Sequence, residues 1–401
     1  LEEYNNGTDP SISNLITLSS EEGNIFTLST GGGDDRDGDG LPDAWEVANG
    51  TDLNTPDGLA DPDGDGLINS LEYEFVKDKN SIEEYKSYID YYINSKFKND
   101  AVKRWHSLEY EIVSNQNSWE GYKIFMDEFP SSQYYYMAKE LYEKLIFEEK
   151  TKNNSISSFE DFIAKHPDTP YRDSIEFTLL KKYTVNNSVD GYLKFLYKFP
   201  QSKYSKLSIN FLYHTSLKEF SAINEMTDNK SLLDSIAEIS NIDKLSLIGF
   251  IEDSVTYFID KNGNKILSNR SFEFENKYLC SFFKDDFFIV KGQDSNIIVN
   301  RNFSEIYRSN FSHVEDMGIG LLKVFSEDDF VVIHKSGKII LRGDYDDAFV
   351  VDNSYLLMEK DNYFTLFTVF GERIFDNVFT DVYKEGTFII FERDIDSRIA
   401  I

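Results

Sequence analysis

The sequence is poor in the features that stabilise or anchor many exported chains. Cys280 is its single cysteine, no apolar run approaches the roughly 20 residues of a membrane-spanning helix, and no basic patch offsets the net charge of -30. These shortages exclude an internal disulfide and a paired-thiol metal site, and they disfavour binding to a phosphate backbone. Apolar residues still make up 40% and aromatic residues 15%, which is too much apolar surface for a disordered chain. We expect a folded chain with Cys280 buried in it.

Motifs of enzymes are also missing. The sequence contains no H-E-x-x-H pair, G-x-S-x-G elbow, Walker loop or Rossmann glycine pattern. Histidine is scarce and scattered: His106, His166, His214, His313 and His334. His166 precedes Pro167 at a predicted helix end, and we expect the other four to be hydrogen-bonded or to face solvent.

Two acidic pairs are candidates for acid–base chemistry. They are Asp285 with Asp286 and Asp328 with Asp329, and both lie beside predicted strand starts and turns. Because such positions are typical of solvated turns, we predict no catalytic site and no enzymatic activity.

The residue composition changes twice along the chain and so divides it into three parts. Glycine and aspartate punctuate the first part, aromatics at helical spacing fill the second, and short apolar runs separated by turns fill the third. We therefore predict three domains, at 1–78, 79–240 and 241–401. The predicted fold class is multidomain α and β, with calcium-loop repeats, then an α-solenoid, then antiparallel β repeats.

Two segments of the first domain, 35–46 and 61–72, fit the pattern D-x-D-x-D-G-x5-E. A hard cation such as Ca²⁺ needs six or seven oxygens at about 2.4 Å, so its ligands must alternate along a chain that wraps around it. Gly40 and Gly66 stand where the loop turns sharply. The predicted ligands, with Leu41 and Leu67 acting through their carbonyls, are Asp35, Asp37, Asp39, Leu41, Asp43, Glu46, Asp61, Asp63, Asp65, Leu67, Asn69 and Glu72.

These loops resemble the thrombospondin type 3 calcium repeat of bacterial exported proteins, because glycines at 31–33 replace an entering helix and the phrases DGDGL, NGTD and LEEY are present. Residues 1–10 resemble the tail of one more repeat, so we expect another loop upstream. Acidic side chains far outnumber basic ones between 31 and 80, and calcium binding should therefore contribute folding energy. Loops of this type outside the cytosol need about 0.1 to 1 mM Ca²⁺, which predicts an extracytoplasmic setting.

The second domain repeats with Pro130, Pro167 and Pro200 in register. An aromatic lies eight positions before each proline, Phe lies five before it and an apolar residue four before it, and this spacing defines one helix face. A Tyr lies four positions after each proline. The prolines end helices, so each unit is a predicted helical hairpin whose aromatics form core. Capping boxes are expected at Ser81 and Ser157. The domain resembles tetratricopeptide repeats, which implies protein binding on a concave surface.

The third domain repeats more weakly, on Gly263, Phe303, Gly337 and Gly371. Each of these residues lies in a tight polar turn between two predicted strands, where a positive φ is required. The units resemble those of β-propellers or of the bacterial repeats named for Trp-Gly, although no Trp-Gly occurs here. Repeated antiparallel β structure is predicted, as a propeller-like or open twisted array.

The function predicted from these modules is a calcium-stabilised, non-enzymatic scaffold that binds proteins at a bacterial cell envelope or surface. The alternative is the accessory C-terminal region of a larger secreted enzyme or adhesin whose active domain lies upstream of residue 1. Binding of a glycan by the β repeats is a third hypothesis, which depends on the aromatic content alone.

Overall fold

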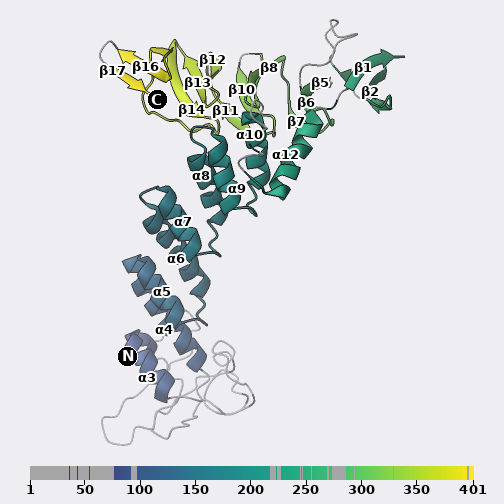
Figure 1. The fold of residues 1–401 in the computed structure, drawn as a ribbon. Coiled ribbons are helices and arrows are strands. Elements are labelled where there is room, and N and C mark those ends of the chain that lie inside the picture. Colours follow the sequence, from purple (N-terminus) through teal and green to yellow (C-terminus); the bar gives the residue numbers. More distant parts are fainter. Residues whose placement is uncertain are drawn as a thin grey trace, which may run out of the picture. The chain divides into compact units, whose positions relative to one another are not determined.

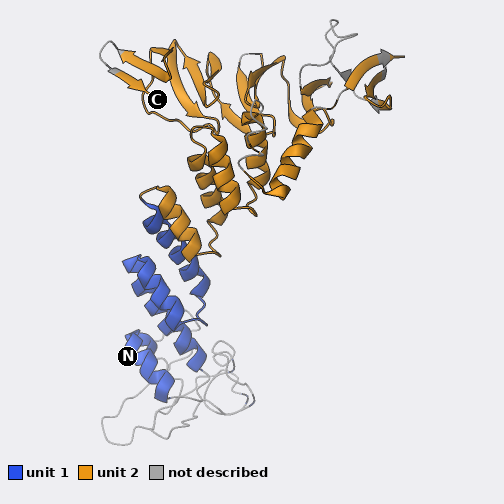
Figure 2. Ribbon diagram, viewed as in Figure 1, with its two compact units in different colours: residues 1–152 blue, residues 153–401 orange. Residues whose placement is uncertain are grey.

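The structure is a computed structural model, and it divides the chain into two compact units, residues 1–152 and 153–401 (Figures 1 and 2). The boundary lies within the helical repeats, and the predicted domain limits at 78 and 240 stay predictions. Cys280 lies outside the described residues. The structure describes residues 36, 43, 54, 76–91, 97–216, 223, 227–243, 245, 247–253, 255–268, 271–272, 286–292, 294–327, 329–394 and 397–401.

Helices form both the described part of the first unit and the start of the second. In the first unit these are α3 (Ile82–Tyr91), α4 (Lys98–Gln116), α5 (Trp119–Glu128) and α6 (Tyr135–Thr151). In the second unit they are α7 (Ile156–Lys165), α8 (Arg172–Tyr183), α9 (Val189–Lys198), α10 (Ser205–Thr215) and α12 (Lys230–Asp243).

The predicted helical hairpins are confirmed in their boundaries. The residues that cap the C-terminal ends of helices α5, α7 and α9 directly precede the three prolines, and there the backbone leaves the helical region: Phe129, His166 and Phe199. The predicted core aromatics of these helices are all buried: Tyr122, Phe125, Phe159, Phe162, Tyr192 and Phe195. Apolar residues at helical spacing therefore pack inside each hairpin, as the repeat predicts.

The predicted helix caps were Ser81 and Ser157, and the structure has a capping serine at the first of these positions but not at the second. Ser81 Oγ accepts from the Glu84 N–H at 3.3 Å, which is the first half of the predicted capping box, and the Glu84 carboxylate pairs with Lys79 at 2.7 Å. The prediction for Ser157 is wrong, because Ser155 caps α7 and accepts from the Ser158 N–H at 3.1 Å. Ser118 and Ser188 cap α5 and α9 in the same way. The serine that precedes the first helical residue thus satisfies an orphan donor in all three repeats.

His106 on α4 gives the first unit a dependence on pH. Its side chain is buried beside the rings of Trp105 and Phe129, and burial lowers the pKa of His106, although Glu109 opposes the shift. A buried neutral histidine binds its proton more weakly than the unfolded chain does. We expect the stability of this unit to be complete above about pH 6.5 and to fall as the pH drops toward the folded-state pKa.

Tryptophan fluorescence during urea unfolding measures this effect, because Trp45, Trp105 and Trp119 all lie in the first unit. The urea midpoint of the wild type should decrease between pH 7.5 and 5. The urea midpoint of the His106→Leu variant should decrease less over the same pH range, because this variant lacks the buried histidine. An equal decrease in both proteins would show that other groups cause it.

The rest of the second unit consists of small antiparallel sheets. Sequential strands pair in the orders β1-β2-β3, β4-β5-β6-β7, β11-β10-β9-β8, β12-β13-β14 and β15-β16-β17. Among the described strands no closed barrel or propeller forms. The strands are β1 (Leu247–Glu252), β2 (Val255–Asp260), β3 (Lys265–Ser268), β4 (Ser271–Phe272), β5 (Phe287–Lys291), β6 (Asn296–Asn300), β7 (Glu305–Ser309), β8 (His313–Gly318), β9 (Leu321–Phe325), β10 (Phe330–His334), β11 (Ile339–Arg342), β12 (Asp347–Val351), β13 (Tyr355–Lys360), β14 (Tyr363–Thr368), β15 (Asp381–Glu385), β16 (Phe388–Asp394) and β17 (Ser397–Ala400).

The four turns predicted by the β repeat are confirmed. Gly263, Phe303, Gly337 and Gly371 have φ of 82°, 61°, 86° and 78°. The first residue of each turn also accepts a hydrogen bond from the backbone N–H two positions on, through its side chain: Asp260, Asn300, His334 and Thr368. His334 therefore occupies a turn position that Asp, Asn and Thr fill in the other units, and its Nδ1 is an acceptor.

Aromatic rings join helix α10 to the sheets within the second unit. Phe211 of α10 stacks on His334 at a ring distance of 3.7 Å and on Phe370 at 4.4 Å. Asn187 Nδ2 donates to the Asn353 carbonyl at 2.8 Å, and Lys181 forms an ion pair with Glu372. Helices α8 and α10 thus pack against the sheets, and α10 lies beside the end of β10.

Candidate functional site

The calcium loops were the site predicted from the sequence, and the structure describes one of their ligands. Asp43, predicted at position 9 of the first loop, accepts a hydrogen bond from the Arg36 N–H at 2.8 Å and pairs with the Arg36 guanidinium at 3.4 Å. The other predicted ligand residues lie outside the described residues. The ligand assignment therefore stays a prediction.

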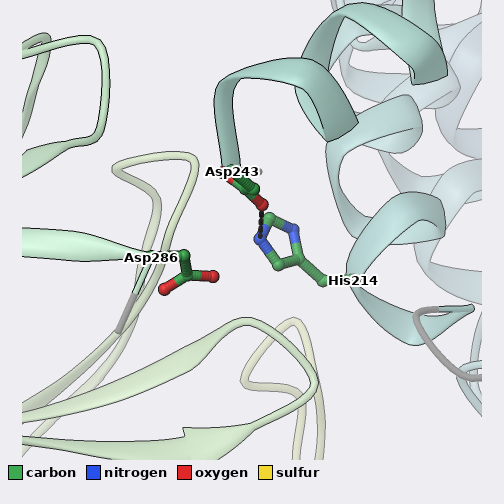
Figure 3. Close-up of side chains that lie close together, drawn as sticks. All are labelled: His214, Asp243 and Asp286. Atoms are coloured by element: carbon green, nitrogen blue, oxygen red, sulfur yellow. Dashed lines mark ion pairs between the residues drawn. The ribbon is translucent and has the colours of Figure 1, made fainter. Parts of the chain in front are cut away.

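A second group of titratable side chains lies in the shared core of the second unit. Three elements position it: His214 is near the end of α10, Asp243 is the last residue of α12, and Asp286 directly precedes β5 (Figure 3). One ligand atom from each residue lies within 4.8 Å of the other two. The three residues are far apart in sequence, and packing of the two helices on the sheets brings them together.

The protonation of His214 follows from its surroundings. The His214 side chain is 2% exposed, and its Nδ1–H donates to the Asn210 carbonyl at 2.8 Å. Burial lowers the pKa of His214 to about 4. The neutral ring therefore presents the lone pair of Nε2 to the carboxylates.

The Asp243 carboxylate faces that lone pair without a proton between them. Asp243 Oδ2 lies 3.7 Å from His214 Nε2, and neither atom has a hydrogen-bond partner. Burial raises the pKa of Asp243 to about 6, and the negative charge of Asp286 adds to the shift. At neutral pH a lone pair and a carboxylate oxygen thus meet in a buried place.

Lys335 supplies the positive charge on the other side of the cluster. Its Nζ lies 2.7 Å from Asp286 and 2.8 Å from Asp316, and its side chain is almost completely buried. Burial lowers the pKa of Lys335, but the two carboxylates outweigh this effect and raise it. Lys335 therefore holds Asp286 in position and acts on Asp243 through its charge alone, together with Arg301 and the Tyr213 hydroxyl.

His334 lies next to His214, with ring centroids 5.0 Å apart. Its pKa is far below the ordinary value because of burial and the neighbouring His214 and Lys335. His214 and His334 are hydrogen-bonded through Nδ1, as expected, but the Nε2 atom of each is buried without a hydrogen-bond partner. The acidic pair containing Asp286 was noticed in the sequence, but nothing there linked it to His214.

Comparison with known proteins bears on the first site. A model of the bacterial TSP3 repeat matches residues 35–52, which include the whole first predicted loop. This match supports a calcium-binding repeat of bacterial type and an extracellular setting. No curated protein matches the chain. None of the described helices is both long and apolar enough to cross a membrane.

One solved structure shares a limited likeness with this chain. It is described as Kluyveromyces lactis Hsv2 complete loop 6CD, and it is 13% identical with a TM-score of 0.18. The match covers 32% of this chain and 43% of that chain, so this chain spans less than half of its length. A likeness at this level carries no argument about fold or function.

Proposed function

We propose that this protein is a calcium-stabilised, non-enzymatic scaffold that binds other proteins at a bacterial cell surface or envelope. The observation that carries the proposal is the bacterial TSP3 match at 35–52, followed along the chain by repeated helical hairpins and small sheets. Calcium at about 0.1 to 1 mM, the range in which extracellular modules bind, would neutralise the acidic loops and order them.

The repeated architecture supports a binding role. We assign the hairpins of α3–α6 and those of α7–α10 to tetratricopeptide-like repeats and the sheets β1–β17 to an open array of propeller-like repeats, because each repeat consists of one supersecondary element. The α5–α6 hairpin exposes large apolar side chains at Ile124, Tyr136 and Met137, and we assign the partner-binding surface to this hairpin. The burial of the His214 cluster favours a structural role for it over turnover of a substrate.

Calorimetric titration of the full chain with calcium tests the first part of this proposal. We expect about two sites, and a thermal transition that moves to lower temperature when calcium is chelated. The Asp35→Ala, Asp61→Ala double variant should lose both sites, because each substitution removes the first ligand of a loop. A control with the same change of charge is Asp168→Ala, Asp376→Ala, at two exposed positions. Equal calcium binding by both variants would refute the loop assignment.

The binding role needs a separate measurement. Cross-linking from a photoreactive residue at Tyr136, with calcium present, should capture specific envelope proteins of the source bacterium. A photoreactive residue at the exposed Tyr363 of β14 provides the comparison. Capture of the same proteins at both positions, or of none, would contradict a specific binding surface on α5–α6.

A further inference from the structure

The arrangement around His214 is that of a metal-ligating histidine. In such sites one ring nitrogen donates its N–H to a backbone carbonyl, which fixes the tautomer and aims the other nitrogen at the metal. His214 Nδ1 donates to Asn210 in this way, and Nε2 points toward Asp243 (Figure 3). The His214 side chain is 2% exposed, and its Nε2 has no hydrogen-bond partner among the described residues.

The charges around the cluster also call for a cation. Asp243, Asp286 and Asp316 supply three carboxylates, and the Lys335 ammonium contacts the second and third of them. Arg301 acts on Asp243 from a position where its guanidinium donates to the Leu245 carbonyl. Three carboxylates against these two cations leave the cluster with an excess of negative charge in a buried place.

We propose that His214 Nε2 and the carboxylates of Asp243 and Asp286 bind one divalent zinc-type ion. The ion joins the ends of α10 and α12 to the start of β5, and it stiffens the junction between the helices and the sheets. This site is separate from the calcium loops, and the inference does not depend on the proposed scaffold function.

The ligand set and its spacing favour zinc over calcium. An imidazole nitrogen suits zinc and other first-row transition ions, whereas calcium takes oxygen ligands almost alone. Ligands about 2.1 Å from a tetrahedral zinc ion lie about 3.4 Å from one another. His214 Nε2 and Asp243 Oδ2 lie 3.7 Å apart, and the three ligand atoms lie within 4.8 Å of one another. Both aspartate side chains therefore rotate inward when the ion binds. A water molecule would supply the fourth ligand.

A shared proton is the competing occupant. Protonated His214 would form an ion pair with Asp243, whereas neutral His214 accepts a metal at Nε2. In the first state Nε2 of His214 carries a proton, and in the second it binds a metal. The two states can be distinguished in the wild-type protein. A measurement on the wild type also avoids dependence on variants that fail to fold.

The first experiment uses the full chain, stripped of metal and then saturated with calcium so that the acidic loops are filled. The histidines are labelled with ¹⁵N, and one equivalent of zinc is added. We expect one buried histidine, with Nδ1 protonated, to show a metal-bound Nε2 signal. No change in any histidine signal on zinc addition, or an imidazolium signal at His214 that persists, would overturn the proposal.

The second experiment locates the ion with variants, again in saturating calcium. Cobalt, used as a coloured substitute for zinc, should give visible absorption bands with one equivalent bound. His214→Gln and Asp286→Asn should each weaken binding by about 100-fold or more, since even the loss of a supporting partner costs about 10- to 100-fold. The controls are His313→Gln and Asp376→Asn, both at exposed positions. Equal cobalt binding by the His214 and His313 variants would place the ion elsewhere and refute the site.

Discussion

Replacement of Phe211 by alanine should lower the free energy of unfolding of the second unit by about 3 to 5 kcal/mol, the usual cost of emptying a buried aromatic position. Phe211 is 1% exposed and lies between the rings of His334 and Phe370, nearly parallel to both, with interplanar angles of 10° and 15°. The substitution removes the side chain that joins α10 to the turn after β10 and the residues after β14. The cavity therefore opens at the contact between helices and sheets.

Urea unfolding followed by far-ultraviolet circular dichroism measures this loss, and hydrogen exchange shows where it occurs. We expect faster exchange in both α10 and β10, because each relies on the same ring for its packing. Phe388→Ala is the matched control, since Phe388 of β16 is 56% exposed in the same unit. A loss for Phe388→Ala as large as that for Phe211→Ala would show that Phe211 has no special place in the junction.

Much of the local structure could be predicted because its signals are local. A proline after each first helix, a serine before it and aromatics at helical spacing decide the hairpins one unit at a time. The turns at Gly263 and Gly337 were predictable for the same reason, since a positive φ restricts the residue at that position alone. The cap at Ser157 was misassigned because Ser155 lies two residues earlier with the same capping chemistry.

The His214 cluster could not be predicted from such signals. His214 lies on α10 and Asp243 on α12, whereas Asp286 comes only after strands β1 to β4. Their meeting depends on how α10 and α12 pack on β5 and β10, which no spacing in the sequence encodes. His334 shows the same limit, because its turn role follows from the β repeat whereas its burial under Phe211 follows from tertiary packing.

Replacement of Gly320 by alanine should destabilise the second unit strongly, because this position combines backbone strain with a close approach of two rings. Gly320 has φ of 80° in the turn between β8 and β9, a conformation that costs alanine about 1 kcal/mol. The new Cβ would lie 2.5 Å from His334 Nε2 and 2.7 Å from His214 Cγ. Both rings are buried and have little room to move, so overpacking adds about 1 to 3 kcal/mol.

Gly318→Ala, at the last residue of β8 beside the same turn, separates the cost of backbone strain from the cost of overpacking. Gly318 has φ of 86°, and an added Cβ there meets nothing within 4 Å. The Gly318 variant therefore reports the backbone strain, and the additional loss in the Gly320 variant reports the clash with the histidine rings. Thermal and urea unfolding of the two variants beside the wild type give this difference. If the two glycines prove equally replaceable, the rings of His214 and His334 are free to move apart, and the tight packing that holds His214 toward Asp243 is not present in solution.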